Sequence, residues 1–296
     1  MKYLLKCLWF FVYYKSLPDR TFLYIHFYRR LGYSLLLRNP ITFNQKIQWL
    51  KLNDRREINK LVADKFEVRN LIAGLVGEDY LIPLIGIYDT IDQFDLENFT
   101  DFPVVVKSTV GCGQVLILRS KTDIDNVVLK GTVDEWFSIF SDIYPYGKEW
   151  QYKGLNKRII VERLLLENDV IPNDYKFHCF NGKVEFIYVS IDREGVNKRA
   201  IYNRNWEKQD ICWGRDIIKF HNSPEIPEPK NLQKMIALSE KISDIFLYIR
   251  VDMYLCKENI YIGELTLHHG SGFDPFVPSD YDLYFGSFLD LKQGKR

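Results

Sequence analysis

Two β-patterned runs near the end of the chain carry charged side chains at alternating positions, and they constrain the fold more than any other stretch. The first run holds Arg250 and Asp252, and the second holds Glu264. A polar turn at 257–259 separates them, so the pattern predicts an antiparallel hairpin. Alternate side chains share one face of a strand, which groups Arg250 with Asp252, and a suitable register adds Glu264. Burying two carboxylates and an arginine requires a counter-ion, which Mg²⁺ carrying phosphates would supply.

The composition excludes several classes of protein. The chain has 296 residues, of which 47% are hydrophobic, and this is enough for a sizeable core and more than one lobe. Its 40 basic and 39 acidic residues argue against a general nucleic-acid binder, although basic side chains can still cluster at one cleft. The five cysteines form no CxxC pair, so a reducing cytoplasm is expected rather than a disulfide framework.

Residues 1–15 are apolar and aromatic, with lysines at both ends of the run. The stretch between Lys6 and Lys15 is far shorter than the roughly 20 residues that span a bilayer, and it lacks a small-residue cleavage site. A helix packed on the body of the protein is the main prediction. Peripheral contact with the inner face of a membrane is the alternative, because aromatics and lysines favour that boundary.

The pattern along the chain changes near residue 80. Before this point helical spacing dominates, and after it short β-patterned runs alternate with glycine-containing turns. The Asn181-Gly182 pair is a strong hairpin signal between two such runs. Helical pattern returns at 121–142 and at about 230–245. This arrangement predicts an α+β protein with antiparallel hairpins.

Lys107 ends an apolar strand and precedes a loop that contains Gly111 and Gly113. Glycine lets backbone N–H groups approach a phosphate without interference from Cβ, and lysine adds a point charge. The loop has neither the Walker A nor the GxGxxG spacing. A phosphate site and a solvated strand edge are therefore both open at this point.

Other charged residues are equally ambiguous when taken alone. Glu162 closes a strand, where it is either a site residue or an ordinary surface acid. Asp174 and Lys176 share a face of the next strand, and a salt bridge on a solvated face explains them as well as a ligand does. Lys198 belongs to a charged segment that solvation alone would explain.

The chain offers no clear nucleophile or zinc site. It has no GxSxG elbow and no HExxH motif, and the adjacent His268 and His269 point to opposite faces of an extended segment. Asp280 and Asp282 fit the bare DxD pattern of glycosyltransferases, but they lie in a polar segment typical of a surface loop. A glycosyltransferase of surface polysaccharide synthesis is thus the alternative function.

Taken in order, these residues form a pattern that resembles the ATP-grasp superfamily, and within it the TupA-like branch associated with teichuronopeptide synthesis and polysaccharide amidation. Three phrases carry the resemblance to that branch: FNQKIQWLK from Phe43, DYKFHCFNG from Asp174 and GELTLHHGSGF from Gly263. The resemblance runs from about Leu17 to Leu291.

The resemblance implies an α+β ATP-grasp fold in which two lobes with antiparallel sheets hold ATP between them. A mostly helical region, 1–80, would precede a small lobe with the glycine loop, 81–166, and a large lobe with the metal site, 167–296.

The resemblance also implies a nucleotide site, formed by Lys65, Lys107, Gly111, Gly113, Glu162, Arg163, Leu164, Asp174 and Lys176. Lys65 and Lys107 would hold phosphates under the glycine loop. Residues 162–164 would line the hinge that holds adenine and ribose. Lys176 would lie near the nucleotide or its γ-phosphate.

By the same resemblance, Asp252 and Glu264 would hold Mg²⁺ between phosphate groups. Two catalytic residues are implied: Lys198 near the nucleotide or its γ-phosphate, and Arg250 at the charge on the transferring phosphoryl group or on the tetrahedral intermediate. Many ATP-grasp enzymes have asparagine two residues after the glutamate, whereas this chain has Thr266. A threonine hydroxyl can ligate a metal or hold water, so the number of metal ions is open.

The activity implied is that of an ADP-forming carboxylate–amine ligase. A substrate carboxylate would attack the γ-phosphate of ATP, and an amine would displace phosphate from the acylphosphate to give an amide. Positioning and charge neutralisation are what such a transfer needs. The implied acid is a uronic acid of a surface polysaccharide or its precursor, and the partner is an amino acid or amine. His268 and His269 are the candidates for a base.

Overall fold

The structure is a computed structural model that describes residues 11–94, 99–138, 142, 144–191, 195, 197–220 and 223–292. The predictions for residues 1–15 therefore lie mostly outside the described residues, which begin with one turn of π-helix at Phe11–Ser16. No helix in the described part of the chain combines the length and the apolar character needed to cross a membrane.

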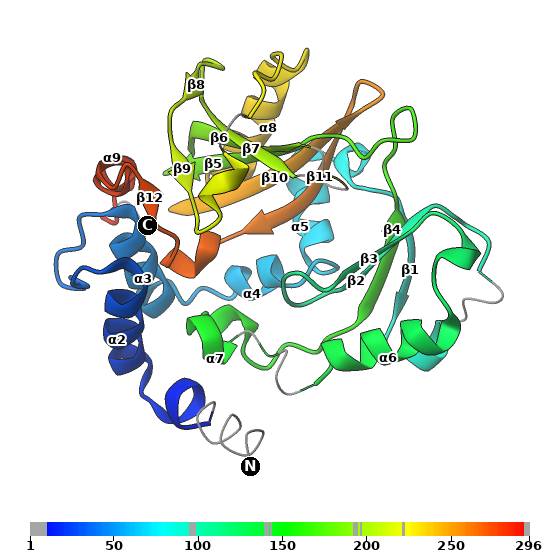
Figure 1. The fold of residues 1–296 in the computed structure, drawn as a ribbon, viewed down its shortest axis with the longest axis horizontal. Coiled ribbons are helices and arrows are strands. Elements are labelled where there is room, and N and C mark those ends of the chain that lie inside the picture. The colour runs from blue at the N-terminus through cyan, green and yellow to red at the C-terminus, as the bar shows by residue number, and fades with distance from the viewer. Residues whose placement is uncertain are drawn as a thin grey trace.

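A four-stranded antiparallel sheet forms the smaller lobe (Figure 1). Its order is β1 (Leu84–Tyr88), β4 (Ile159–Arg163), β2 (Val104–Ser108) and β3 (Val115–Leu118). Helix α6 (Asn126–Trp136) packs on one face, where Val104, Val106 and Val161 belong to a shared core. Alternation along the strands therefore turns Val105, Lys107 and Glu162 to the opposite face.

A six-stranded antiparallel sheet forms the larger lobe. Its order is β11 (Asn259–Thr266), β10 (Tyr248–Cys256), β5 (Asp174–Phe180), β6 (Lys183–Ile191), β7 (Lys198–Asn203) and β8 (Lys208–Gln209). The predicted Asn181-Gly182 hairpin joins β5 to β6, with both turn residues at positive φ. Helix α8 (Leu232–Ser243) covers one face through Met235 and Ile242. The other face is left for the site.

Four helical segments precede residue 80: α2 (Asp19–Leu31), α3 (Phe43–Asn53), α4 (Ile58–Ala63) and α5 (Val68–Val76). Helices α3, α4 and α5 share cores with the six-stranded sheet, whereas α2 packs in a separate cluster with Phe273. Helix α3 begins at a capping box formed by Thr42 and Gln45. Its apolar side packs with α9 (Asp280–Phe288) and the small sheet of β9 (Cys212–Trp213) and β12 (Phe276–Val277) over one end of the large sheet. Helix α7 (Tyr144–Gly147) lies next to α2, where the Tyr144 hydroxyl donates to Asp19 at 2.9 Å (Figure 1).

Candidate functional site

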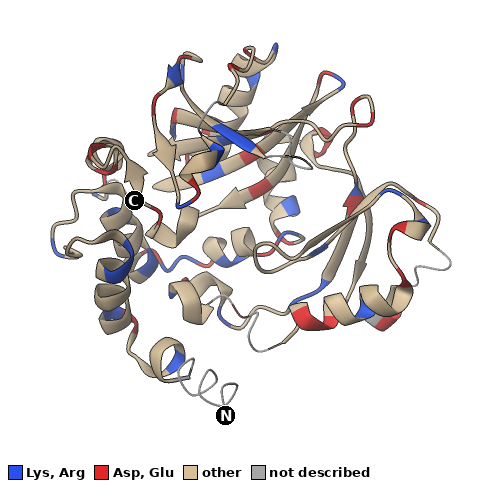
Figure 2. Ribbon diagram, in the orientation of Figure 1, with Lys and Arg blue, Asp and Glu red and all other residues tan. Residues whose placement is uncertain are grey.

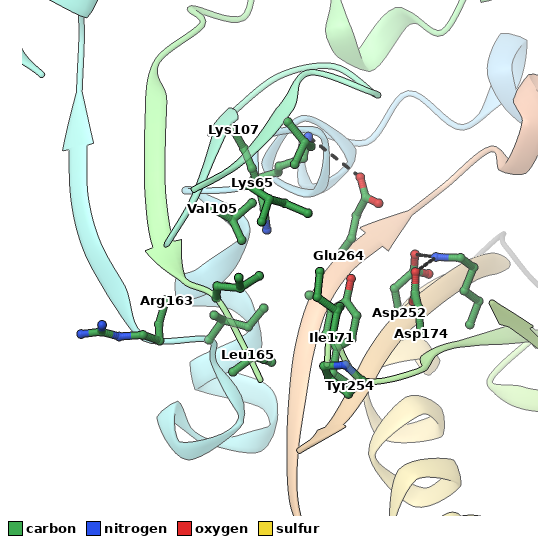
Figure 3. Close-up of a pocket in the computed structure, with 17 residues that line it drawn as sticks. Lys65, Val105, Lys107, Arg163, Leu165, Ile171, Asp174, Asp252, Tyr254 and Glu264 are labelled. Carbon is green, nitrogen blue, oxygen red and sulfur yellow. Dashed lines mark hydrogen bonds and ion pairs between the residues drawn. The ribbon is translucent and has the colours of Figure 1, made fainter. Parts of the chain in front are cut away.

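A cavity of about 150 Å³ lies between the two sheets (Figure 3). Both lobes and the segment that joins them contribute to its walls, which consist of Lys65, Ile82, Val105, Lys107, Val115, Ile117, Arg163, Leu164, Leu165, Ile171, Pro172, Asp174, Lys176, Asp252, Tyr254, Gly263 and Glu264.

The cavity has an apolar part and a charged part. Val105, Val115 and Ile117 come from the inward face of the small sheet, and Leu164 and Leu165 follow β4 on the connection to the large lobe. The charged side chains come mainly from β5, β10 and β11. An apolar slot that leads to a cluster of cations and carboxylates fits a flat heterocycle with an attached polyphosphate.

The predicted hairpin is present and its register brings the charged residues together. Asp252 on β10 lies directly opposite Glu264 on β11 and opposite Lys176 on β5. A β-bulge at Gly263 sets this register, since Met253 pairs with Ile262. A side chain at position 263 would displace the Tyr254 ring, because a Cβ would stand 2.6 Å from it.

Asp252 is the centre of a buried ion-pair network. Its Oδ1 accepts from Arg250 Nε at 2.6 Å, and its Oδ2 accepts from Arg250 and from Lys176 Nζ, both at 2.7 Å. Lys176 also donates to Asp174 at 2.6 Å. Burial alone would raise the pKa of Asp252, but Arg250 and Lys176 outweigh it and lower this pKa to about 2.

The carboxylates fit a metal ion that is shared with phosphates. Glu264 is 37% exposed at the side chain and lies beside Asp252 on the same face, with Lys65 Nζ at 3.9 Å. No group of three or more His, Cys, Asp or Glu side chains in the described residues could hold a metal by itself. Mg²⁺ commonly takes one or two carboxylates and completes its shell with phosphate oxygens and water, and this pair suits that mode.

Lys107 and Glu162 form a second ion pair, on the inward face of the small sheet. Lys107 Nζ donates to Glu162 Oε2 at 2.7 Å, and Arg69 of α5 donates to Oε1 at 2.8 Å. Glu162 therefore orients Lys107 from beside the cavity and does not line it. The Arg163 guanidinium points away from the other labelled side chains in Figure 3, and it donates to the carbonyls of Asp101 and Phe102. Leu164 supplies the hinge wall.

Lys65 links the glycine loop to the metal side of the site. Its Nζ donates to the Gly111 carbonyl at 2.6 Å while it faces Glu264. Gly111 and Gly113 both have positive φ, which explains the two glycines, although neither lines the cavity. The loop thus lies next to the expected phosphates through Lys65.

The structure does not group Lys198 with the other predicted residues. Lys198 has the strand parity of Ala200 and Tyr202, whose side chains pack on the α8 side of the large sheet. Its neighbour Arg199 lies on the site face, where it pairs with Ser190 and stands over the Tyr188 ring at 5.8 Å. Strand alternation is a signal that could have favoured Arg199 from the sequence.

Thr266 lies beside the network and outside the cavity wall. It pairs with Arg250 across the hairpin, one residue pair beyond Glu264 and Asp252 on the same face. Arg250 itself is held by Asp252 and by His269 Nδ1 at 2.7 Å. Burial and the charge of Arg250 hold the pKa of His269 well below its usual range.

Helix α3 explains the first of the three phrases, which the sequence left without a role. Gln48 donates to the carbonyls of Ser271 and Gly272 at 3.0 and 2.7 Å. Lys51, fully buried, donates to the Gly147 carbonyl at 2.7 Å and to the Ser271 carbonyl at 2.8 Å. The helix therefore fixes the segment that follows the metal-side strand.

His268 has a different environment from His269. Its Nδ1 lies 3.2 Å from Glu149 Oε2 and 3.0 Å from the Gln151 amide, inside the protein. Burial raises the pKa of Glu149, but His268 and Lys51 outweigh this and lower it. The two histidines are therefore held differently: Arg250 contacts the Nδ1 of His269, whereas Glu149 and Gln151 contact the Nδ1 of His268.

The DxD pattern is part of helix α9, and the prediction of a surface loop there is wrong. Asp282 is buried and accepts from the Asn44 backbone N–H at 2.8 Å, the Asn44 amide at 3.1 Å and the Tyr33 hydroxyl. Its oxygens anchor α3 and α9 to each other. This use removes the residue support for a nucleotide-sugar site.

A family model described as TupA-like ATP-grasp matches residues 45–290. No curated protein sequence matches the chain significantly. Among solved structures, the D-alanine–D-alanine ligase of Bacillus anthracis is similar at 18% identity and a TM-score of 0.40, covering 70% of this chain and 57% of that one.

Two other solved structures are similar to a comparable degree. The D-alanine–D-alanine ligase of Helicobacter pylori shows 13% identity and a TM-score of 0.42, covering 83% of this chain and 65% of that one. The L-amino acid ligase of Bacillus licheniformis shows 13% identity and a TM-score of 0.40, covering 80% and 50%. The chain thus spans about half to two thirds of the length of these proteins.

Proposed function

Because the chain belongs to the TupA-like ATP-grasp family, we propose that it is an ADP-forming carboxylate–amine ligase that uses Mg-ATP. The observation that carries the proposal is the register of the β10–β11 hairpin. It sets Asp252 beside Glu264 at the charged end of a cavity whose other end is apolar. The apolar end suits adenine, and the charged end suits a triphosphate with its metal.

The residues of the chain supply the positioning that the transfer needs. Lys107, oriented by Glu162, and Lys65 would hold phosphate oxygens, and Asp252 with Glu264 would hold Mg²⁺, which neutralises phosphate charge when bound. Arg250, fixed by Asp252, would stabilise the charge that develops on the phosphoryl group.

The proposed reaction has two steps. The substrate carboxylate attacks the γ-phosphorus, ADP leaves, and the acylphosphate carbon then takes an amine as phosphate departs. His268, held near Glu149, would accept the proton that the amine loses. No covalent bond to the protein is needed.

The acid we propose is a uronic acid of a surface polysaccharide or its precursor, and the amine is an amino acid or a simple amine. The resemblance of the three phrases to the teichuronopeptide branch supports this choice. We also propose a cytoplasmic location, with peripheral membrane contact through residues 1–15, whose aromatics and lysines support it.

The test is ADP release in the presence of Mg-ATP, a panel of uronic acids and a panel of amines. The expected result is release that requires both an acid and an amine, with an amide product seen by mass spectrometry. Binding of UDP-sugars with no response to ATP would instead support the glycosyltransferase alternative. Absence of ADP release across a broad screen would count against the ligase.

A further inference from the structure

A second and larger depression lies on the outer side of helix α3, away from the nucleotide cavity. It has a volume of about 490 Å³, and we call it the outer groove. The loop before α3, the segments that follow α3 and α9, and α3 itself form its walls, which consist of Arg38, Asn39, Pro40, Lys46, Trp49, Asn53, Asp54, Arg55, Arg56, Leu247, Asp290, Leu291 and Lys292.

One helix separates the outer groove from the site. Lys46, Trp49 and Asn53 face the groove at helical spacing, whereas Gln48 and Lys51 on the other side of α3 hold the segment around Ser271. A helix with its side chains is about 10–12 Å across. A long ligand in the groove would therefore lie about one helix width from the segment that follows Glu264.

The groove concentrates positive charge. Five cations and two carboxylates give it a net charge of +3, on a chain whose total is +1. Arg56 already neutralises Asp54 through bonds of 2.7 and 2.8 Å. Figure 2 shows the blue of Lys and Arg along α3 and the segment after it.

Three of these cations, Arg38, Arg55 and Lys292, have no carboxylate partner among the described residues, and all three are exposed. One of them, Arg55, stands over the Trp150 ring at 5.4 Å. Lys46 differs, because it is occupied by the carbonyls of Gly286 and Leu289 at 2.8 and 2.6 Å. The groove thus has unpaired guanidinium groups, which bind carboxylates in a bidentate manner.

Trp49 adds an apolar surface to this charge. It is half-buried and packs against the core of the large lobe, so its position is fixed. Two amides lie beside it in the groove wall: Asn39, and Asn53, whose Nδ2 donates to the Trp49 carbonyl at 2.8 Å and whose side-chain oxygen can accept from a ligand. The outer groove thus combines a fixed aromatic ring with amides and guanidinium groups. These groups match a chain of sugars that carry carboxylates, since the faces of sugar rings are apolar and their edges are polar or anionic.

We propose that the outer groove binds a carboxylate-bearing oligosaccharide, namely a stretch of the acidic polymer that the enzyme modifies. The identity of this polymer rests on the proposed function, but the binding itself does not. Occupying the groove would hold a long acceptor on the enzyme while a uronic acid enters the site, so polymeric acceptors would be preferred over single sugars.

The test measures binding of a galacturonic acid hexamer by calorimetry, without ATP. The groove variants are Arg38→Ala/Arg55→Ala and Trp49→Ala. The matched control, Arg20→Ala/Arg119→Ala, removes the same charge from outside the groove. We expect each groove variant to bind at least about tenfold more weakly than wild type, a loss of about 1.4 kcal/mol in binding free energy. The control should bind as wild type does. Circular dichroism and a thermal midpoint confirm that each variant is folded.

Two further ligands distinguish recognition of sugar rings from nonspecific electrostatic attraction of any polyanion to the groove. Maltohexaose, a neutral hexamer, should bind at least tenfold more weakly than the acidic one, and polyphosphate binding should be unaffected by Trp49→Ala. Equal binding by the groove variant and the control double variant would overturn the proposal. So would a Trp49→Ala variant that binds the acidic hexamer as wild type does.

Turnover gives an independent readout. The groove variants should raise KM for a polymeric acceptor several-fold and leave kcat with a single uronic acid unchanged. If no acid supports ADP release but the hexamer still binds through the groove, the proposed reaction fails and the groove assignment stands. If turnover occurs with identical KM for polymer and monomer in all variants, the groove assignment fails and the ligase stands.

Discussion

Asp252 receives three charge-assisted hydrogen bonds from Arg250 and Lys176, and this fixes the chemistry of the site at the scale of single residues. Removing one member of such a buried network leaves the others without full compensation. Glu264 is only partly buried and meets its cations at 3.6 and 3.9 Å. The two carboxylates on the metal side of the site therefore differ in how much they contribute to the stability of the fold.

Substitutions of Asp252 and Glu264 should affect turnover similarly but stability differently. Asp252→Asn should lower turnover by at least about 100-fold and the free energy of unfolding by about 3 kcal/mol, because Arg250 and Lys176 lose their counter-charge. Glu264→Gln should lower turnover to a similar degree and change stability by less than about 1 kcal/mol, since it is more exposed. ADP release and urea unfolding measure both effects. Wild-type turnover by Glu264→Gln would refute its role.

Thr266 tests how many oxygen ligands the metal side offers. It pairs with Arg250 next to the Asp252–Glu264 pair and on the same face, so we expect its hydroxyl to lie near the metal. Thr266→Val should raise the Mg²⁺ concentration needed for half-maximal ADP release by about tenfold, and Thr266→Ser should not. Thr266→Asn should lower it, because an amide oxygen is a better ligand. An unchanged Mg²⁺ dependence in all three variants would exclude Thr266 from the metal site.

At the scale of elements, helix α3 contributes side chains both to the support of the segment that follows β11 and to the outer groove. Its inward polar side chains hold the backbone of 271–272, and its outward side forms part of the outer groove. This arrangement removes one lysine side chain from solvent. Lys51 is completely buried, with its ammonium group on backbone carbonyls.

Lys51 makes stability depend on pH. Burial, opposed by Glu149 and Asp19, lowers the pKa of Lys51 to about 7, below the value near 10.4 expected in the unfolded chain. Between these values the unfolded state binds more protons, so the free energy of unfolding should rise as the pH increases from 7 to 9. Lys51→Met should flatten this rise, and the exposed-site control Lys234→Met should keep it. Urea unfolding at pH 7, 8 and 9 measures the slope.

At the scale of the whole molecule, the nucleotide cavity joins parts that are distant in sequence. Lys65 precedes α5, Lys107 belongs to the small sheet, and Asp252 belongs to the large one. A ligand that contacts all three residues connects the two lobes. Binding should therefore stabilise the lobes together.

Mg-ATP should raise the thermal midpoint of the protein. A ligand at 100 times its Kd adds about 2.7 kcal/mol, or roughly 4 °C for a chain of this size. Lys107→Met should reduce the rise at the same concentration, because a phosphate contact is lost. Scanning fluorimetry measures it, with Lys130→Met as an exposed control on the same lobe. Equal rises in wild type and Lys107→Met would place the phosphates elsewhere.

Short-range patterns were enough to predict the α+β class, the β5–β6 hairpin and the pairing of Arg250 and Asp252 on one face. These follow from local rules, namely the period of a strand and the conformations that Asn-Gly favours. The family was also readable from ordered phrases in the sequence, and the match over 45–290 confirms it. Lys198 remains a prediction that strand parity does not favour.

Only the tertiary structure decided which charges meet. The bulge at Gly263 sets Glu264 opposite Asp252, Glu162 turns out to orient Lys107, and Asp282 is consumed in holding α3 to α9. The first depends on a bulge inside one hairpin, and the other two depend on contacts between residues 55 and 238 positions apart, which no local spacing encodes. The sequence by itself determined the family and the hairpin, because both are local patterns. The cavity and the outer groove came from packing, because each forms where separate elements meet.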